Sequence, residues 1–258
     1  MRAGPTAIAW VLASGCVHVS HEPTTIDAGR ASAEALPAEF TLLSWNTHKQ
    51  RDRRFAAELV RFAAGVELVL LQEAIEHDPA WSLVPDAHAW TLVIAFEFGR
   101  SEVATGVATG STAAPQGERA LLSPHHEPLT RTPKSALVSW LNVAGEGEPL
   151  LLVNLHGINF RRAARLDAQL RTLDALLEAH AGPAVVAGDF NTWSRARREV
   201  VEDFARRHEL VSPFDRIAEL RFDNVYVRGL EIVGAEVLPS RSSDHDALRV
   251  ELAVPRTG

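Results

Sequence analysis

The chain has 258 residues, of which 46% are hydrophobic and 23% are charged, which is enough for one large α/β core or two small ones. Its formal net charge of −7 argues against a protein that coats duplex nucleic acid without sequence preference. The sequence has no internal repeat, heptad run or low-complexity tract of useful length, which excludes solenoids and coiled coils.

The first residues have the pattern of an export signal. Arg2 precedes an apolar run at residues 7–12, and small residues then lead to Cys16, the only cysteine of the chain. This run is shorter than the roughly 20 residues that span a bilayer, so a secretory signal fits better than a membrane helix. The segment Leu-Ala-Ser-Gly-Cys also resembles a bacterial lipoprotein cleavage box, with Ala13 where a large aliphatic residue is usual. An ordinary signal peptide and a buried N-terminal segment are the alternatives.

These features predict a signal peptide at residues 1–15, of the lipoprotein type, and a lipid on Cys16. The protein is then exported and anchored in a bacterial cell envelope, or is otherwise secreted or periplasmic. Residues 16–38 are polar and mixed and contain two prolines, so they are predicted to be a tether. The folded domain is predicted at residues 39–258, with no protein partner and with the membrane contacted only through the lipid.

From residue 39 onward, short apolar runs bounded by turn residues alternate with a few amphipathic stretches. Strands are expected at residues 41–45, 68–72, 91–96, 135–143, 150–156, 184–188, 222–227 and 247–252. Helices are expected at residues 53–64, 161–180 and 195–208, where apolar residues recur at helical spacing. Many strands, several of them consecutive, against few helices predict two sheets packed face to face with helices outside. A doubly wound parallel sheet would need more helices.

The segment at residues 185–191 carries the clearest chemical signal. A buried apolar strand there delivers Asp189 and Asn191 to its exit, and because side chains alternate along a strand, both point the same way while Phe190 turns back. Gly188 leaves room for a substrate or for a neighbouring backbone. A turn capped by its own polar residues is the alternative explanation.

Other apolar strands also lead into or out of polar residues that suit catalysis. In chain order, with the two above, these residues are Asn46, Glu73, His156, Asp189, Asn191, Asp223, Asp244 and His245. Each one alone has an ordinary explanation as a turn residue, a helix cap or a buried histidine. We expect the whole set to converge at one edge of the packed sheets.

In this order the residues resemble the endonuclease/exonuclease/phosphatase superfamily, which includes deoxyribonuclease I, abasic-site endonucleases, sphingomyelinases and inositol polyphosphate phosphatases. The motifs are L-L-S-W-N, L-L-Q-E, N-L-H, G-D-F-N, R-F-D-N-V-Y-V and S-S-D-H, spread over residues 40–252. The chain looks most similar to an uncharacterised bacterial branch with W-N-x-x-K-Q and G-D-F-N-x-W-S-R. The resemblance implies a four-layer αββα sandwich of mainly antiparallel sheets and metal-dependent hydrolysis of a phosphate ester. Two departures are Asn224, where many relatives have an aromatic residue or a histidine, and a long loop expected after G-V-A-T-G-S.

The resemblance also implies roles for the metal and water ligands. Glu73, Asn46 and Asp244 would hold Mg²⁺, or Mn²⁺, because oxygen ligands suit these ions. Asp189 would align or deprotonate the attacking water. Asn191 would donate to a phosphoryl oxygen while accepting from the water.

Two histidines would flank the phosphate. Asp223 would hold one tautomer of His245, whose role as base or as charge stabiliser stays open. His156 would contact the phosphate or help to protonate the leaving oxygen, with Glu127 as a partner. The residues expected to bind substrate are Lys134, Asn159 and Arg195.

Basic residues follow three of the motifs, at residues 49–54, 161–165 and 195–198, and would rim the site with positive charge. Phe160 and Trp193 offer a stacking face for a base. These features favour nucleic acid as substrate and an extracytoplasmic nuclease as function. The alternative is that the arginines pair with acids on helix surfaces and that Trp193 only packs.

Two other functions are considered. A phosphatase or lipid phosphodiesterase would use the same scaffold, but the chain lacks the adjacent exposed aromatic residues of a sphingomyelinase-like hairpin and the W-x-G-D-x-N-Y segment of inositol phosphatases. A catalytically dead binding module typically loses residues of this set, all of which are present here. An abasic-site repair role conflicts with export.

Overall fold

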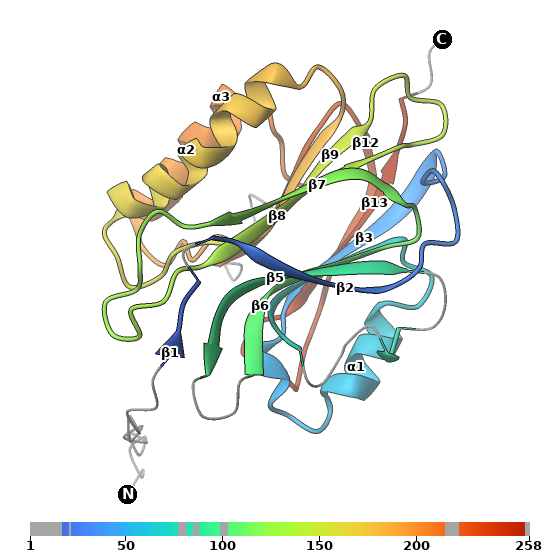
Figure 1. Cartoon of the computed structure of the whole chain (residues 1–258). Helices are drawn as coiled ribbons and strands as arrows, with labels where there is room; N and C mark the ends of the chain where they lie inside the picture. Colours follow the sequence, from blue (N-terminus) through green and yellow to red (C-terminus); the bar gives the residue numbers. More distant parts are fainter. Residues whose placement is uncertain are drawn as a thin grey trace, which may run out of the picture.

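The computed structural model describes residues 17–20, 22–76, 82–84, 88–98, 103–214 and 222–255. The predicted signal peptide and Cys16 lie outside these residues. Two sheets pack face to face, with α1 on the outer side of one and α2 and α3 on the outer side of the other (Figure 1). The helices are α1 (Phe55–Phe62), α2 (Ala163–Ala179) and α3 (Arg195–Arg207), with a short 3-10 turn η1 (His48–Gln50). This is the four-layer αββα sandwich predicted from the sequence.

The two sheets differ in size. The larger one has eight strands, which are β1 (Val17–His18), β2 (Thr24–Gly29), β3 (Glu39–Asn46), β4 (Leu68–Ile75), β5 (Ala89–Phe98), β6 (Val103–Ser111), β12 (Glu231–Leu238) and β13 (Ala247–Ala253). Their order is β1-β5-β6-β4-β3-β13-β12, and β2 also pairs with β5. The smaller one has five strands, which are β7 (Pro115–Leu122), β8 (Ser135–Leu141), β9 (Leu150–His156), β10 (Ala184–Asp189) and β11 (Asp223–Arg228). Their order is β11-β10-β9-β8-β7.

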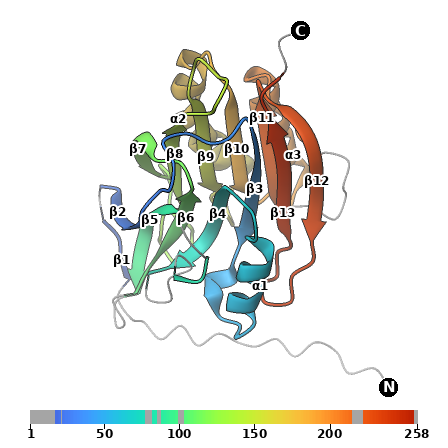
Figure 2. The same ribbon diagram turned by 90° about the vertical axis from the view of Figure 1, so that its right-hand side faces the viewer.

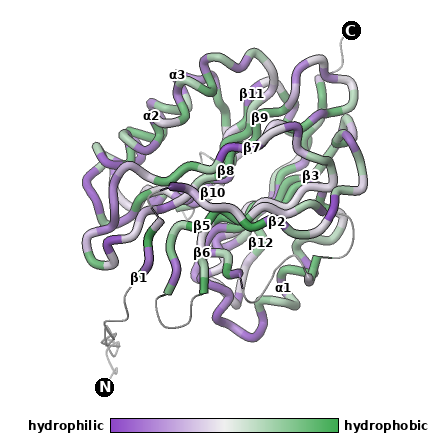
Figure 3. Tube along the Cα trace, viewed as in Figure 1, coloured by the Kyte–Doolittle hydropathy of each residue, from purple (hydrophilic) through white to green (hydrophobic). Residues whose placement is uncertain are grey.

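The helices pack through apolar residues that recur every three or four positions. Helix α1 buries Phe55, Leu59 and Phe62 against the larger sheet. The rings of Phe55 and Phe62 lie 5.5 and 5.3 Å from the ring of Trp45. Helices α2 and α3 each bury one stripe on the smaller sheet, and Figure 3 shows hydrophobic and hydrophilic residues alternating along both. None of the helices in the described part of the chain is long and apolar enough to cross a bilayer.

Two pairs of neighbouring strands are parallel, β3 with β4 and β9 with β10, and one helix joins the strands of each pair (Figure 2). In a parallel pair both carboxyl ends lie at the same edge of the sheet. The first pair therefore brings Asn46 and Glu73 to one edge, and the second pair brings His156 and Asp189 to an edge. A strand–helix–strand unit of the same plan thus occurs once in each sheet.

A fully buried polar link crosses the space between the two sheets. Gln72 on β4 donates to Asn154 on β9 at 2.8 Å, and the Asn154 amide donates to three further oxygens of β4 and β6. Both side chains are fully buried. Because a buried polar group without a partner costs about 1–3 kcal/mol, the link favours one alignment of the sheets. It thereby sets Glu73 relative to His156, which lie one and two residues further along the same strands.

The predicted strands and helices are present, with ends that differ by a few residues. The strands expected from the sequence do not include β1, β2, β6, β7 and β12. Strands β7 and β12 are largely exposed and polar, so they lack the apolar runs that signal a strand. The long loop expected after G-V-A-T-G-S is instead strand β7, which pairs with β8.

The tether predicted at residues 16–38 is wrong where the structure describes it. Strand β2 pairs along its length with β5, strand β1 pairs with the end of β5, and Leu36 is buried in the core between the sheets. These residues look like a linker because the two strands at this edge bury few side chains and therefore carry few apolar residues. The folded domain begins before residue 39.

Candidate active site

Four predicted site residues lie at the ends of the two parallel strand pairs. Asn46 ends β3 and Glu73 lies near the end of β4, whereas His156 ends β9 directly opposite Asp189, the last residue of β10. The pairing of β4 with β6 is interrupted at Glu73, whose backbone is left-handed with φ 55°. An interruption of this kind redirects a side chain out of the regular strand alternation. It explains why Glu73 leaves the core that its neighbours on β4 occupy.

Asp189 is buried, with 2% of its surface exposed, and is held from both sheets. Its Oδ1 accepts from the backbone N–H of Asn191 at 2.8 Å. Its Oδ2 accepts from Asn46 Nδ2 at 3.0 Å and lies 3.5 Å from His156 Nε2. Gly188 has φ 138°, and a Cβ there would meet a β9 carbonyl oxygen at 2.0 Å, so the close neighbour predicted for this glycine is backbone. The carboxylate is therefore fixed in position.

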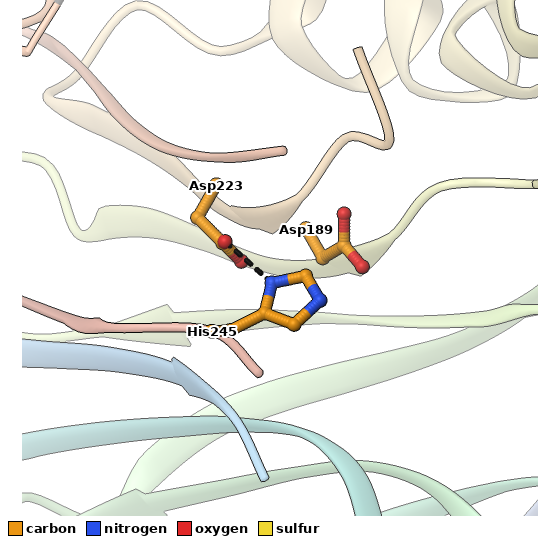
Figure 4. Close-up of side chains that lie close together, drawn as sticks. All are labelled: Asp189, Asp223 and His245. Carbon is orange, nitrogen blue, oxygen red and sulfur yellow. Dashed lines mark hydrogen bonds and ion pairs between the residues drawn. The ribbon is translucent and has the colours of Figure 1, made fainter. Parts of the chain in front are cut away.

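His245 pairs with Asp223 beside this carboxylate. Its Nδ1 and Asp223 Oδ2 are 2.6 Å apart, and the backbone oxygen of His245 accepts from Trp45 Nε1 at 3.1 Å. Ligand atoms of Asp189, Asp223 and His245 all lie within 4.8 Å of one another. Figure 4 shows the imidazole ring next to both carboxylates, with one nitrogen bonded to Asp223. The bond at Nδ1 holds the ring in one orientation, with Nε2 facing away from Asp223.

The surroundings of these groups shift their pKa values in different directions. Burial, with the negative charge of Asp223, raises the pKa of Asp189. Burial opposes the charged form of His245, but Asp223 and the other nearby carboxylates outweigh it and raise the pKa of His245 to about 10. Burial and the Lys134 cation hold the pKa of His156 well below its usual value. At neutral pH His245 is therefore a cation, His156 is neutral, and Asp189 is suited to exchange a proton.

Glu73 is surrounded by amines instead of carboxylates. Lys49 Nζ donates to Glu73 Oε2 at 2.5 Å, and Lys134 Nζ lies 3.8 Å from Oε1. Burial opposes ionisation of Glu73, yet Lys49, His156 and Lys134 together lower its pKa to about 2. Lys134 also lies 3.3 Å from Glu127. Glu127, which the sequence suggested as a partner for His156, is therefore a partner of Lys134.

The three predicted metal ligands carry oxygen atoms of the kind that a divalent cation prefers. Glu73 offers a carboxylate that stays ionised and already holds a cationic amine. Asn46 offers a side-chain oxygen that accepts from the backbone N–H of His48 at 3.1 Å and has a second lone pair. The Asp244 carboxylate is 66% exposed and lies 3.2 Å from His48 Nδ1. Donors of this type suit Mg²⁺ or Mn²⁺.

The cluster of Asp189, Asp223 and His245 is compact enough to hold one ion as well. A metal ligand must give up its proton, and the raised pKa of His245 means that its ring is protonated. The Asp223 bond also occupies Nδ1. Glu73, Asn46 and Asp244 offer oxygen donors only, which suit Mg²⁺ or Mn²⁺ better than a set that includes this histidine.

Two further predicted residues lie beside His245. Asn191 is buried in a left-handed conformation with φ 53°, and its Nδ2 donates to the Gly157 carbonyl at 3.0 Å, so one of its amide hydrogens is already engaged. Asn159 and Asn191 line a pocket of about 470 Å³ together with Phe160, Trp193, Phe222, Asp244 and His245.

The predicted basic rim is mostly engaged in other contacts. Arg195 donates to Glu199 on the same helix at 2.8 Å, Arg161 donates to the His126 carbonyl, and Arg165 contacts His125. The structure therefore does not bring Arg195 to the pocket described above. Of the basic residues predicted to bind substrate, Lys134 lies at the site.

Two charged residues hold the loops of the site: Glu58, which the sequence did not assign to it, and Arg197, which was predicted only as part of the basic rim. Glu58 on α1 accepts hydrogen bonds of 2.6 to 3.1 Å from hydroxyl and backbone groups of residues 240–242, just before Asp244. Arg197 on α3 is fully buried and donates to the carbonyls of Ile158, Arg161 and Asn191. The sequence could have indicated their burial, because each lies at helical spacing with the apolar residues that its helix buries.

Comparison with known proteins agrees with this geometry. A model of the Endonuclease/Exonuclease/phosphatase family matches residues 43–245. A UPF0294 protein of Vibrio vulnificus is 35% identical over 222 residues, covering 83% of this chain and 77% of that protein. A UPF0294 protein of Yersinia pestis is 32% identical over 237 residues, covering 88% and 89%.

Solved structures share the fold at low sequence identity. An endonuclease/exonuclease/phosphatase family protein from Leptotrichia buccalis has a TM-score of 0.63 at 16% identity and covers 82% of this chain and 98% of that one. The human Nocturnin catalytic domain with bound sulfate anion has a TM-score of 0.63 at 16% identity, covering 91% and 99%. TDP2 from Caenorhabditis elegans has a TM-score of 0.61 at 14% identity, covering 84% and 74%. With the family match over most of its length, this chain belongs to the endonuclease/exonuclease/phosphatase family.

Proposed function

We propose that this protein is a divalent-metal-dependent phosphodiester hydrolase that cleaves nucleic acid outside the cytoplasm. Members of its family hydrolyse phosphate esters, which gives the reaction class. The observation that carries the proposal is the packing of the buried Asp189 against Asn46, His156 and the His245–Asp223 pair. A proton acceptor and a cationic donor thus lie side by side, which is what attack on a charged phosphate requires.

The side chains divide the chemistry among themselves. Asp189 accepts the proton of the attacking water, because its raised pKa brings it near the range of a general base. His245 donates from Nε2 to a phosphoryl oxygen, with Asp223 fixing the ring. The neutral His156 binds the phosphate or the leaving oxygen. When bound, the cation held by Glu73, Asn46 and Asp244 neutralises negative charge that develops in the transition state.

A substrate panel tests the reaction and its target. Purified protein is incubated with plasmid DNA, single-stranded DNA, RNA, a small phosphodiester and sphingomyelin, each with Mg²⁺, with Mn²⁺ and with EDTA. We expect cleavage of nucleic acid that EDTA abolishes and that Asp189→Asn lacks. The nuclease assignment fails if every nucleic acid survives while another ester is hydrolysed.

One observation favours a second candidate, a phosphomonoesterase. The amines of Lys49 and Lys134 flank Glu73, and amines near the reacting phosphate suit the dianion of a phosphomonoester better than a singly charged diester. Comparing 4-nitrophenyl phosphate with bis(4-nitrophenyl) phosphate separates the two candidates. Faster hydrolysis of the monoester, lost in Lys49→Met, would favour this second function.

The extracytoplasmic location rests on residues 1–16, whose charged start, apolar run and Cys16 suit a lipoprotein signal. Mass spectrometry of protein purified from a bacterial envelope tests it. We expect an N-terminal residue 16 that carries acyl groups. An intact, unmodified Met1 would remove the lipid anchor from the proposal.

A further inference from the structure

Two exposed aromatic side chains face one pocket next to the catalytic groups. Phe160 is 65% exposed and Trp193 is 45% exposed, and no other phenylalanine or tryptophan in the described ranges is comparably exposed. Both line the pocket of about 470 Å³ that also contains Phe222, Asn191 and His245. Large aromatic surfaces left in water beside a reactive group are typical of a binding site, because a ligand can cover them.

The pocket is held in a fixed shape. Asn159 Oδ1 accepts from Trp193 Nε1 at 3.0 Å and from the backbone N–H of Phe160 at 2.8 Å. Phe160 has a left-handed backbone with φ 53°, which is unusual for a bulky residue. The buried Arg197 lies 5.4 Å from the Trp193 ring and donates to the Ile158 carbonyl of the same loop. The Trp193 ring and the Phe160 backbone are therefore held in place before any ligand arrives, which lowers the entropy cost of binding.

The polar group of the pocket selects among aromatic ligands. Because both hydrogen bonds to Asn159 use its oxygen, the Nδ2 hydrogens have no partner among the described residues. They can donate to a ring nitrogen or a ring carbonyl. A planar ring with acceptors on its edge fits both the aromatic faces and this donor, whereas an acyl chain or a choline group offers no such acceptor.

We propose that this pocket binds an unpaired nucleobase of the nucleotide whose phosphate contacts His245, so that the enzyme acts on single-stranded nucleic acid. This inference rests on the proposed function and adds the form of the substrate. A base in a duplex is stacked and paired on both sides and would have to leave the helix to enter, whereas an unpaired base stacks on the rings directly.

Binding is measured without catalysis, by fluorescence anisotropy in EDTA. The probes are a labelled single-stranded oligonucleotide and a strand of the same length whose residues lack bases. We expect the abasic strand to bind about 5- to 100-fold more weakly, as base–aromatic stacking predicts. Trp193→Ala and Phe160→Ala should weaken binding of the base-containing strand about fivefold or more and leave the abasic strand unchanged. Trp193→Phe should restore most of the affinity.

Val233→Ala is the matched control, because Val233 is another exposed apolar side chain, 58% exposed on β12, and should change nothing. Phe160→Ala keeps the test valid if Trp193→Ala fails to fold, because most of the Phe160 side chain lies outside the core. Equal affinity for the base-containing and abasic strands, or unchanged binding in both aromatic variants, overturns the base pocket.

Cleavage in Mg²⁺ separates this inference from the nuclease proposal. A wild-type enzyme that cleaves both strands at equal rates keeps the nuclease assignment and loses the base pocket. Base-dependent binding without cleavage of any nucleic acid keeps the pocket and loses the nuclease assignment. Faster cleavage of duplex than of single strands would contradict the single-stranded substrate.

Discussion

The two strand–helix–strand units share a plan but present carboxylates of opposite character. Glu73, at the end of the unit in the larger sheet, faces two lysine amines, and its pKa is lowered to about 2. Asp189, at the end of the unit in the smaller sheet, is buried beside Asp223, and its pKa is raised. The topology places one carboxylate at the end of each unit, and the neighbouring side chains lower the pKa of one and raise the pKa of the other.

The strongest test of this division removes the proton acceptor. Asp189→Asn keeps the size of the side chain and an oxygen for the Asn191 N–H, but it cannot accept a proton at neutral pH. We expect the rate of phosphodiester hydrolysis to fall about 1,000-fold, the middle of the range for a general base. Asp203→Asn, on the exposed surface of α3 where it pairs with Arg206, is the control and should retain full activity. Equal rates in Asp189→Asn and wild type would mean that this carboxylate is not the base.

The second test concerns the cation. Glu73→Gln keeps the shape of the side chain and removes its charge, so we expect the affinity for Mn²⁺ to fall at least about tenfold by isothermal titration calorimetry. Asp189→Asn should change this affinity by less than about threefold, because Asp189 is not assigned to the cation. An equal loss of Mn²⁺ affinity in the two variants would contradict the assignment of the cation to Glu73.

A third test asks whether the loops around the site depend on the buried arginine. Arg197→Leu leaves three carbonyls without their donor, and we expect the free energy of unfolding in urea to fall by about 2–4 kcal/mol. Arg198→Leu changes the exposed neighbour on the same helix and should stay within about 0.5 kcal/mol of wild type. If both variants are equally stable, Arg197 does not hold these loops.

The smallest effect is a shift along the pH axis. Because the pKa of Asp189 is raised, this group stays protonated at pH values where an exposed aspartate is already ionised. Activity that needs the ionised form should therefore be lost as pH falls through a value above 3.8, the ordinary pKa of aspartate, about tenfold per pH unit below it. Glu118→Gln, which removes another carboxyl group with a raised pKa, should leave the profile unchanged. An acid limb centred at or below pH 4 would contradict the assignment.

Most of what could be predicted from the sequence concerns the central strands and the polar residues at their ends. The apolar runs that lead into Asn46, His156 and Asp189 can be recognised in the sequence, because a strand that is buried on both faces needs continuous hydrophobic residues. The edge strands β2 and β7 were missed because a strand with exposed residues needs no such run. Their place in the sheet depends on pairing with β5 and β8, which no local pattern encodes.

The roles of individual basic residues could not be predicted from the sequence without the fold. Lys49, Arg195 and Arg197 belong to basic stretches that look alike in the sequence. In the structure the first contacts Glu73, the second pairs with Glu199 on the surface, and the third is buried under the Asn159 loop. Which face of each element meets the core decides among these outcomes, and that is a property of tertiary packing.

The pairing of β1 and β2 with β5 bears on how freely the domain would move about the proposed lipid anchor. A flexible linker as long as residues 17–38 would let the domain explore roughly 25 Å from its attachment point. Instead, Val17 is already paired with Phe98 at the edge of the larger sheet. A lipid on Cys16, as proposed, would therefore keep the domain close to the bilayer, because Cys16 directly precedes the first residue that is paired to the sheet.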